Sequence, residues 1–476
     1  MMHNQIRERP GDAPVRQDTD AVRVCQGADG RGFPTSHHRS FAVKSFHRFF
    51  LVLALSSLSS VSLIAQTSPD SLAEIHRQID ILTKEIEGLK LGAVDAPVYE
   101  SKTGLGIAAS KVYSLKKSGV SLAGYGEIVY ENYGTTRDNG SATTTLDKID
   151  ALRNIIYVGY RFNDWVLFNS EVEFEHANTA KGGEASVEFA YIDLLLSRSL
   201  NIRAGMVLVP VGIINEKHEP PTFYGTLRPN VERLIIPSTW RTNGAGVHGE
   251  IVPGLNYRAY VIEGLRMASY TAGDGIRGGR QSGASAVAED LAVTGRVDYA
   301  GVNGATFGAS FYAGNSGQGA KDSIGKGINA MTTVAAVHGE YAWRGLEVRG
   351  LFAQTTVDEA DRVGGYIQWT TKSASAPVIG STMNGWYLSA GYDVMPYLMP
   401  GSSHVVAPYV LYEKYDTQAD VITGRNASPA NDRSTFVVGL TWKPHANVAF
   451  KADYRDNKNG AGTGTDQWNV AVTYLY

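Results

Sequence analysis

Cysteine and long hydrophobic runs are almost absent from this chain of 476 residues. The single cysteine, Cys25, excludes a disulfide-stapled fold and a metal or redox centre built on several thiols. The only long apolar run is Phe49–Ala65, so the chain is not a bundle of transmembrane helices. Charged residues make up 19% of the chain, and acidic residues outnumber basic ones by 47 to 44. This balance argues against a nucleic-acid partner.

Recognisable catalytic and metal-binding signatures are also lacking. No G-x-S-x-G nucleophile motif occurs. His176, His218 and His248 do not have the spacing of recurrent metal sites, and isolated histidines usually have structural roles. The sequence therefore predicts no enzyme, no catalytic residue, no cofactor and no metal.

The apolar run predicts a secretory signal in preference to a membrane anchor. Lys44, His47 and Arg48 form a basic region next to it, and the serine-rich run is short for a membrane span. We expect residues 44–65 to be the signal peptide, cleaved after Ala65, and residues 1–43 to be a spurious or non-structural leader. Removal of the 8 basic and 5 acidic residues of this region leaves a net charge of −6 and removes Cys25.

A heptad pattern follows the predicted cleavage site. Its apolar residues are separated by alternating steps of three and four positions: Leu72, Ile75, Ile79, Leu82, Ile86 and Leu89. This spacing predicts a coiled-coil helix over residues 70–91. Self-association and packing of one helix on a barrel mouth both fit the pattern, and we favour self-association. Residues 92–117 are predicted to be a linker.

Sixteen runs of alternating residues occupy the rest of the chain, and most have about ten residues, which suits a tilted strand in a bilayer. Very short connections, such as Asn163–Asp164, alternate with longer ones, such as 134–152, 266–286 and 358–383. Outer-membrane barrels have this arrangement, with short turns at one rim and long loops at the other. We predict an all-β fold: a 16-stranded antiparallel transmembrane β-barrel over residues 118–476, with the short N-terminal helix in the periplasm.

The predicted strands have one apolar and one charged face. Val438 and Leu440, for example, lie opposite Thr441. A soluble β-sandwich shows the same alternation, but the signal peptide and the number of strands favour a barrel with its polar face inward. Its lumen is too wide for side chains to fill, so water is expected inside. The candidate lumen-wall residues are Arg153, Arg161, Glu171, Glu173, Glu175, Lys451 and Arg455.

The connection 211–242 is the strongest candidate for a segment that narrows the pore. It is long for a hairpin loop and carries several large apolar residues, including Leu234, Ile235 and Trp240, which inward folding would bury. Its candidate constriction and selectivity residues are Lys217, Arg228, Arg233, Arg241, Glu216 and Glu219. Either these charges select ions, or they pair with wall charges such as Glu171 and hold the segment in place.

Three stretches resemble the phosphate-selective porin O and P family of bacterial outer-membrane porins. They are SGVSLAGYGEIVYENY (118–133), NIRAGMVLVPVG (201–212) and LTWKPHANVAFKADYRDN (440–457). The resemblance implies a trimeric sixteen-stranded channel whose third loop folds inward and whose lumenal arginines and lysines guide anions. Met206, Leu208 and Leu411 stand where basic or polar lumenal residues are expected, and the wall carries acids such as Glu188. From this resemblance we therefore expect a porin, but we do not expect phosphate selectivity.

The predicted function is a passive, water-filled channel of the bacterial outer membrane for small hydrophilic or anionic solutes. The alternative is a non-conducting structural or adhesive barrel. Expected partners are outer-membrane lipids, two further copies in a homotrimer, and the barrel assembly machinery. The final strand should pair with the first and close the barrel. Its terminal aromatic residue, Tyr476, is the candidate assembly signal.

Overall fold

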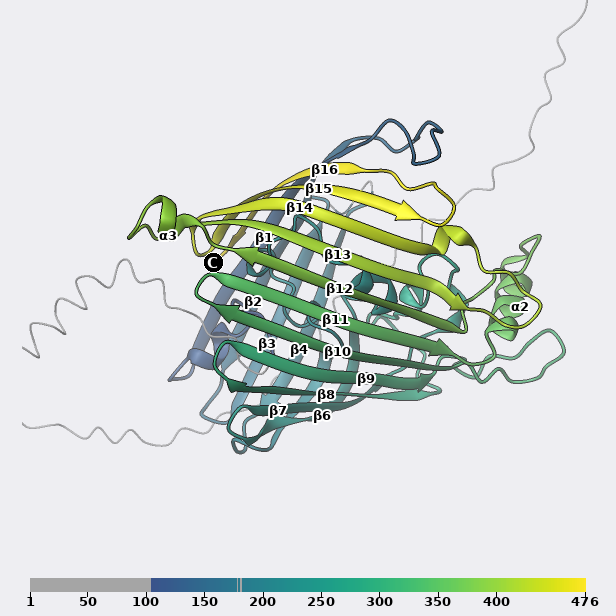
Figure 1. Ribbon diagram of the computed structural model, residues 1–476. Coiled ribbons are helices and arrows are strands. Elements are labelled where there is room, and N and C mark those ends of the chain that lie inside the picture. Colours follow the sequence, from purple (N-terminus) through teal and green to yellow (C-terminus); the bar gives the residue numbers. More distant parts are fainter. Residues whose placement is uncertain (1–103, 178, 180–181) are drawn as a thin grey trace, which may run out of the picture. The chain divides into compact units, whose positions relative to one another are not determined.

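The computed structural model describes residues 104–476 except 178, 180 and 181 (Figure 1). In this part of the chain sixteen strands form one closed barrel, in which consecutive strands pair and β1 pairs with β16. Neighbouring strands run antiparallel throughout. The predicted 16-stranded antiparallel barrel is therefore confirmed. The predicted leader, signal peptide and coiled-coil helix lie outside the described residues.

The strands cover most of the barrel region, and short helices lie in its connections. The strands are β1 (Gly119–Tyr133), β2 (Lys148–Arg161), β3 (Val166–Glu175), β4 (Glu184–Leu194), β5 (Asn201–Leu208), β6 (Arg241–Val252), β7 (Leu255–Glu263), β8 (Leu291–Val302), β9 (Ala305–Asn315), β10 (Met331–Trp343), β11 (Leu346–Val357), β12 (Thr382–Tyr392), β13 (Val405–Asp420), β14 (Asp432–His445), β15 (Val448–Asn459) and β16 (Gln467–Leu475). The helices are η1 (Lys111–Ser114), η2 (Pro220–Thr222), η3 (Val231–Ile235), η4 (Met267–Ser269), η5 (Arg277–Gly279), α2 (Ala360–Thr371), α3 (Met395–Leu398) and η6 (Pro429–Asn431). None of these helices is both long and apolar enough to span a bilayer.

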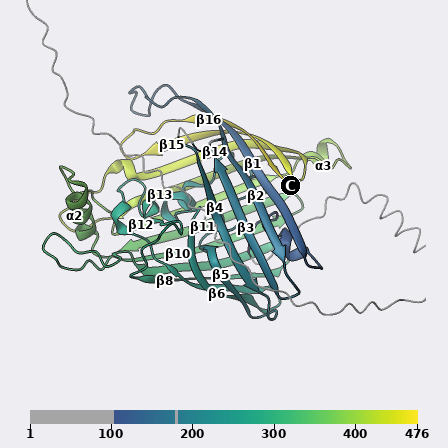
Figure 2. The same cartoon turned by 180° about the vertical axis from the view of Figure 1, so that it is seen from behind.

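The two ends of the barrel differ in their connections. At one end, here called the turn end, most connections have only a few residues, as between β6 and β7 or between β8 and β9. The other end, the loop end, carries the long connections, including the one with α2. In Figure 1 α3 and the C-terminus lie at the turn end and α2 at the loop end. The back view shows β1 to β6 crossing their wall at a tilt (Figure 2), as expected for a closed barrel.

Side chains alternate between the outside and the inside of the wall. On β14, Val438 and Leu440 point outward and are each 46% exposed. Thr441, on the opposite face of the strand, points inward and is fully buried. On β15, the charged residues Lys451 and Asp453 are buried inside. The outer face of the barrel is therefore apolar, and the charged residues of these strands lie inside, as the alternation predicts.

The last strand closes the barrel against the first. The register pairs Tyr125 with Leu475 and Tyr133 with Gln467. Beyond the strand, Gly124 and Tyr476 exchange two backbone hydrogen bonds, with N···O distances of 3.0 and 2.8 Å. The predicted closure by the final strand is confirmed. Whether Tyr476 acts as an assembly signal stays a prediction.

Residues 104–117, the described part of the predicted linker, lie against the inner wall. The Asn169 side chain on β3 donates a hydrogen bond of 2.8 Å to the carbonyl of Ala109. The Tyr113 hydroxyl donates one of 2.5 Å to Asp193 on β4. This stretch therefore fills part of the lumen beside β3 and β4.

Candidate functional site

The connection between β5 and β6, residues 209–240, folds into the barrel and is called the inward segment below. Asn215 ties its two ends together, because its side-chain amide donates to the carbonyls of Val209 (2.7 Å) and Trp240 (2.9 Å) and its oxygen accepts from the Trp240 amide (2.7 Å). The Glu232 carboxylate adds a second tie by accepting from the amides of Ile213 (2.8 Å) and Ile214 (2.6 Å). The inward segment is therefore a closed, hydrogen-bonded loop.

The apolar residues of the inward segment form a small core inside the barrel. Val231, Leu234, Ile235 and Ile236 are all at most 1% exposed. Their helix, η3, contacts β11, β12 and β13. The Thr355 hydroxyl on β11 donates to the carbonyl of Ile235 at 2.8 Å. Burial of this apolar surface and these wall contacts together hold the segment inside the lumen.

Strands β13 and β15 bind the middle of the inward segment through buried charges. The Lys451 ammonium group donates to the carbonyls of Pro220 (2.7 Å), Phe223 (2.7 Å) and Gly225 (2.9 Å). Asp453 accepts from the amide and hydroxyl of Thr226, at 2.9 and 2.7 Å. Glu413 on β13 likewise accepts from Asn230 and from the Val231 amide, at 2.8 and 3.1 Å.

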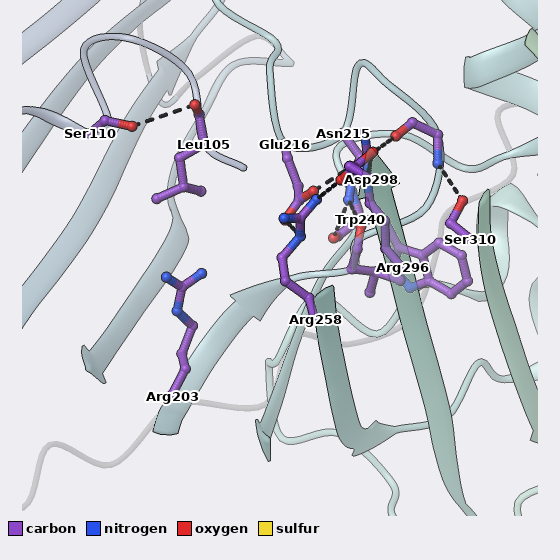
Figure 3. A network of polar contacts seen from close by, with 12 residues as sticks. Leu105, Ser110, Arg203, Asn215, Glu216, Trp240, Arg258, Arg296, Asp298 and Ser310 are labelled. Carbon is purple, nitrogen blue, oxygen red and sulfur yellow. Dashed lines mark hydrogen bonds and ion pairs between the residues drawn. The ribbon is translucent and has the colours of Figure 1, made fainter. Parts of the chain in front are cut away.

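The start of the inward segment meets a charged cluster on β7 and β8 (Figure 3). Glu216 pairs with Arg258 at 3.1 Å and with Arg296 at 3.6 Å. Both arginines also pair with Asp298, at 2.5 and 2.7 Å. Arg296 also donates to the backbone carbonyl of Gly212. The segment is thus bound to walls that lie on different sides of the barrel.

The neighbouring residues of the segment bind further strands. Lys217 pairs with Glu340 on β10 at 3.0 Å, and His218 contacts Glu171 on β3 at 3.0 Å. Glu219 accepts hydrogen bonds from the amides of Ala108 (2.8 Å) and Ala109 (3.0 Å). Burial raises the pKa of Glu219, although the two amide donors oppose that shift.

A cavity of about 520 Å³ opens at the loop end and is called the loop-end cavity. Its lining contains eight basic residues and three acidic ones: Lys148, Arg153, Arg228, Arg233, Arg277, Arg433, Arg455 and Lys458 against Glu127, Glu131 and Glu175. Some of these basic groups are neutralised nearby, as Arg153 is by Glu127 at 2.8 Å and Arg455 by Glu413 at 3.4 Å.

Four guanidinium groups of the loop-end cavity form no ion pair with a carboxylate in the described part of the chain: those of Arg228, Arg233, Arg277 and Arg433. Arg277 donates instead to the carbonyls of Arg233 (3.1 Å) and Ser238 (2.9 Å). Burial, and then the positive charges of Arg280 and Arg233, lower the pKa of Arg277 to about 9. The arginine remains charged at neutral pH, so this cavity concentrates positive charge.

Two further cavities continue from the loop-end cavity towards the turn end. A void of about 40 Å³, the waist cavity, shares Phe223 and Leu227 with the loop-end cavity. It shares Glu347 and Arg349 with a cavity of about 470 Å³ at the turn end, the turn-end cavity. The waist is lined mainly by aromatic and apolar side chains: Ile214, Phe223, Tyr224, Leu227, Pro229, Tyr387, Tyr409 and Leu411. The waist cavity therefore lies beside each of the other two, which share no lining residue with one another.

The predicted constriction residues have different surroundings. Arg228 and Arg233 line the loop-end cavity, and Lys217 lines the turn-end cavity. Glu216 and Glu219 are buried in the contacts above, and Arg241 pairs with Glu188. Some of these charges therefore line cavities, others pair with the wall, and Lys217 and Arg241 do both; that any of them selects ions stays a prediction.

The predicted lumen-wall residues also divide into groups. Arg153, Glu175 and Arg455 line the loop-end cavity, while Glu173 lines a fourth cavity beside it. Glu171 and Lys451 bind the inward segment. Arg161 lies apart from these groups and donates to the carbonyl of Asp164 at 2.7 Å in the β2–β3 turn.

Several charged residues of the site were not predicted. Arg258, Arg296 and Asp298 lie on the polar faces of β7 and β8, so the alternation could have placed them inside. Arg277 lies in a loop, where no periodic pattern indicates its position. The path of the inward segment decides which of these residues it meets.

These features define a closed sixteen-stranded β-barrel with a folded segment and charged cavities inside, and the barrel resembles outer-membrane barrels. No protein-family model matches the chain. The chain belongs to the same family as an uncharacterized protein from Aquifex aeolicus (strain VF5). The two are 36% identical over 394 residues, which cover 82% of this chain and 87% of that protein.

Solved structures share the fold at low sequence identity. OmpF of Salmonella typhi, in complex with daunomycin, is 15% identical and has a TM-score of 0.51, with 75% of this chain and 98% of that chain covered. The outer membrane channel DcaP of Acinetobacter baumannii is 11% identical and has a TM-score of 0.49, with 76% and 99% covered. At 15% identity the likeness to OmpF shows the fold alone. Membership of the phosphate-selective porin O and P family is not shown.

Proposed function

We propose that this protein is a porin of the bacterial outer membrane: a passive channel for small hydrophilic solutes, with a preference for anions. The observation that carries the proposal is the row of three adjoining cavities inside a closed barrel. In this proposal a solute moves along this row and passes the inward segment at the waist cavity, which serves as the constriction.

The outer face of the barrel supports a position in a membrane. Large apolar side chains such as Val297, Phe311 and Leu388 are exposed there. Such a face is costly in water and suits lipid hydrocarbon. A closed barrel also satisfies the backbone hydrogen bonds of all its strands, as a bilayer requires.

The charges of the loop-end cavity support anion preference. Arginines that form no ion pair with a carboxylate attract anions into the cavity and repel cations. The aromatic waist that follows favours small solutes over large ones. We infer a general anion preference and assign no particular solute.

We also propose how the protein is exported and assembled. The signal peptide at 44–65 directs export, the helix at 70–91 lies in the periplasm and self-associates, and three copies form a homotrimer. The aromatic end of β16, Tyr476, is read by the barrel assembly machinery. These assignments rest on the sequence patterns and on the family resemblance.

A specific observation favours a second candidate, a non-conducting structural or adhesive barrel. The inward segment is bound to strands on several sides of the lumen, and the waist cavity measures only about 40 Å³. A segment held in this way could seal the barrel.

Reconstitution in a planar bilayer separates the two candidates. We expect the conductance to rise in steps and to depend on salt. Under a salt gradient at low ionic strength, the sign of the reversal potential should indicate that anions pass more easily than cations. A sealed membrane would overturn the channel and support the structural barrel.

Arg233→Glu should shift the selectivity towards cations. A unit charge reversed about 8 Å from the ion path changes the ion energy by roughly 1 kcal/mol in water, about a fivefold change in occupancy. The shift should shrink as salt rises, because exposed charges are screened. The matched control is Arg425→Glu, the same charge change at an exposed loop residue that lines none of the described cavities. Equal reversal potentials for the two variants would show that Arg233 does not set the selectivity.

A further inference from the structure

A buried group of three side chains joins the inward segment to strands β3 and β4. Glu171 and Glu188 come from the strands and His218 from the segment, and all three are at most 2% exposed. One potential ligand atom from each residue lies within 4.8 Å of the others. The tetrahedral zinc sites of proteins place ligand atoms about 3.3 Å apart, so side-chain movements of roughly 1.5 Å would close the group on an ion.

The hydrogen bonds of His218 hold its second ring nitrogen against Glu171. Nδ1 lies 3.0 Å from the backbone carbonyl of Asn215, which can only accept, so Nδ1 carries a proton. Nε2 then faces Glu171 Oε1 at 3.0 Å. Nδ1 is thus held by a backbone carbonyl, as in the usual metal-binding histidines, and a cation at Nε2 would replace the proton that Nε2 shares with Glu171.

The carboxylates retain free ligand atoms. Glu188 gives one oxygen to Arg241, but its Oε2 has no hydrogen-bond partner within the described part of the chain. The same holds for Glu171 Oε2. Buried carboxylate oxygens without donors are costly, and a cation among them would remove that cost.

An entry path leads to the group. Glu188 and Glu173 line a cavity of about 610 Å³, the side cavity. The side cavity shares Glu175, Thr239 and Arg277 with the loop-end cavity, so the two adjoin. A hydrated ion can therefore approach Glu188 from the loop end.

We propose that Glu171, Glu188 and His218 form a binding site for one divalent transition-metal ion. One imidazole nitrogen and two carboxylate oxygens suit zinc and its first-row neighbours better than calcium or magnesium. The ion fastens His218, and with it the start of the inward segment, to β3 and β4. The site does not depend on conduction, since a sealed barrel would hold the ion equally well.

Metal binding to the purified full chain in detergent tests the site. The protein is stripped with a chelator, loaded with zinc, desalted in a non-chelating buffer and analysed for metal by mass spectrometry. We expect one zinc ion per chain in the wild type. His218→Gln and Glu188→Gln should bind at least about tenfold more weakly. The matched controls, His176→Gln and Glu250→Gln, change a histidine and a glutamate outside the group and should keep full binding.

The site is overturned if the wild type binds no zinc, or if all four variants retain zinc equally, which means adventitious binding only. X-ray absorption of the zinc-loaded wild type decides the question even if the variants fail to fold. A zinc coordination shell with one imidazole among oxygen ligands supports the site, and a coordination shell without imidazole refutes it. Neither measurement involves conductance, so failure of the metal site and failure of the channel are told apart.

Discussion

Lys451 shows how a single lumenal side chain can position a whole segment. Its ammonium group is buried on β15 and donates to three carbonyls of residues 220–225. It also lies 4.3 Å from the centre of the Phe223 ring. Phe223, Tyr224 and Gly225 line the waist cavity, so the position of Lys451 bears directly on the lining of that cavity.

Lys451→Met should therefore loosen the waist. Methionine has similar length but no donors, so three buried carbonyls lose their partner. The free energy of unfolding should fall by about 2–4 kcal/mol, measured by denaturant titration in detergent micelles. Single-channel recordings should show larger or noisier conductance.

The control for Lys451→Met is Lys458→Met on the same strand. Lys458 pairs with Asp456 at 3.4 Å with its side chain 58% exposed, and such pairs contribute less than about 1 kcal/mol. If both variants unfolded at the same denaturant concentration, the carbonyl contacts of Lys451 would not stabilise the barrel.

At the scale of elements, β1 and the end of the chain fit together through glycines. The ring of Tyr476 lies over Gly124 and that of Tyr474 over Gly126, where an added Cβ would come within 2.5 and 2.4 Å of the tyrosine hydroxyls. At Gly124 the added carbon would also meet the backbone oxygen of Ile155 at 2.3 Å. The glycines therefore make room for the terminal aromatics at the closing pair of strands.

Gly124→Val should weaken barrel closure. The added side chain clashes with the Ile155 backbone on β2 and with the Tyr476 ring, and such overpacking costs about 1–3 kcal/mol. The measurement is the temperature at which the folded band disappears in unheated-sample gel electrophoresis, which should fall. Gly119→Val is the matched control on the same strand, because nothing lies within 4 Å of its added Cβ. An equal effect of both substitutions would mean that β propensity, and not the closing contact, sets the stability.

Much of the element scale could be predicted from the sequence, because alternation and turn residues are local signals. They specified the strand number, the outward face and the alternation of long and short connections. Several boundaries shift by a few residues, and the largest shift is at β2, which begins at Lys148, within the predicted connection 134–152. Pairing of Lys148 with Glu131 on β1 extends the strand through residues that do not alternate.

The contacts of the site could be predicted only in part. Lys217, Arg228 and Arg233 were placed in the correct connection, since its length and apolar content indicated inward folding. Their partners depend on residues far away in the chain, as when Lys217 meets Glu340. Such pairs follow from the path of the segment across the lumen, which no periodic pattern encodes.

At the scale of the whole molecule, the barrel has two parts: the wall of strands and the inward segment. The wall is closed by its own strand pairing, and the inward segment fills space within it. The segment has its own ties, because Glu232 binds the amides of Ile213 and Ile214 and brings the two sides of the segment together. We therefore expect the wall to form without the segment, so that removal of the segment changes the passage more than the barrel.

We expect replacement of residues 217–233 by a short glycine–serine linker to leave a folded barrel with conductance at least about twofold higher. Sixteen strands enclose a lumen too wide for wall side chains to fill, so removal of the segment opens the waist to water. The control replaces residues 360–376, a stretch of equal length that includes α2 at the loop end, and should conduct like the wild type. Circular dichroism checks that both variants keep their strands. Unchanged conductance in the first variant would place the ion path away from the inward segment, and the waist cavity would then not be the constriction.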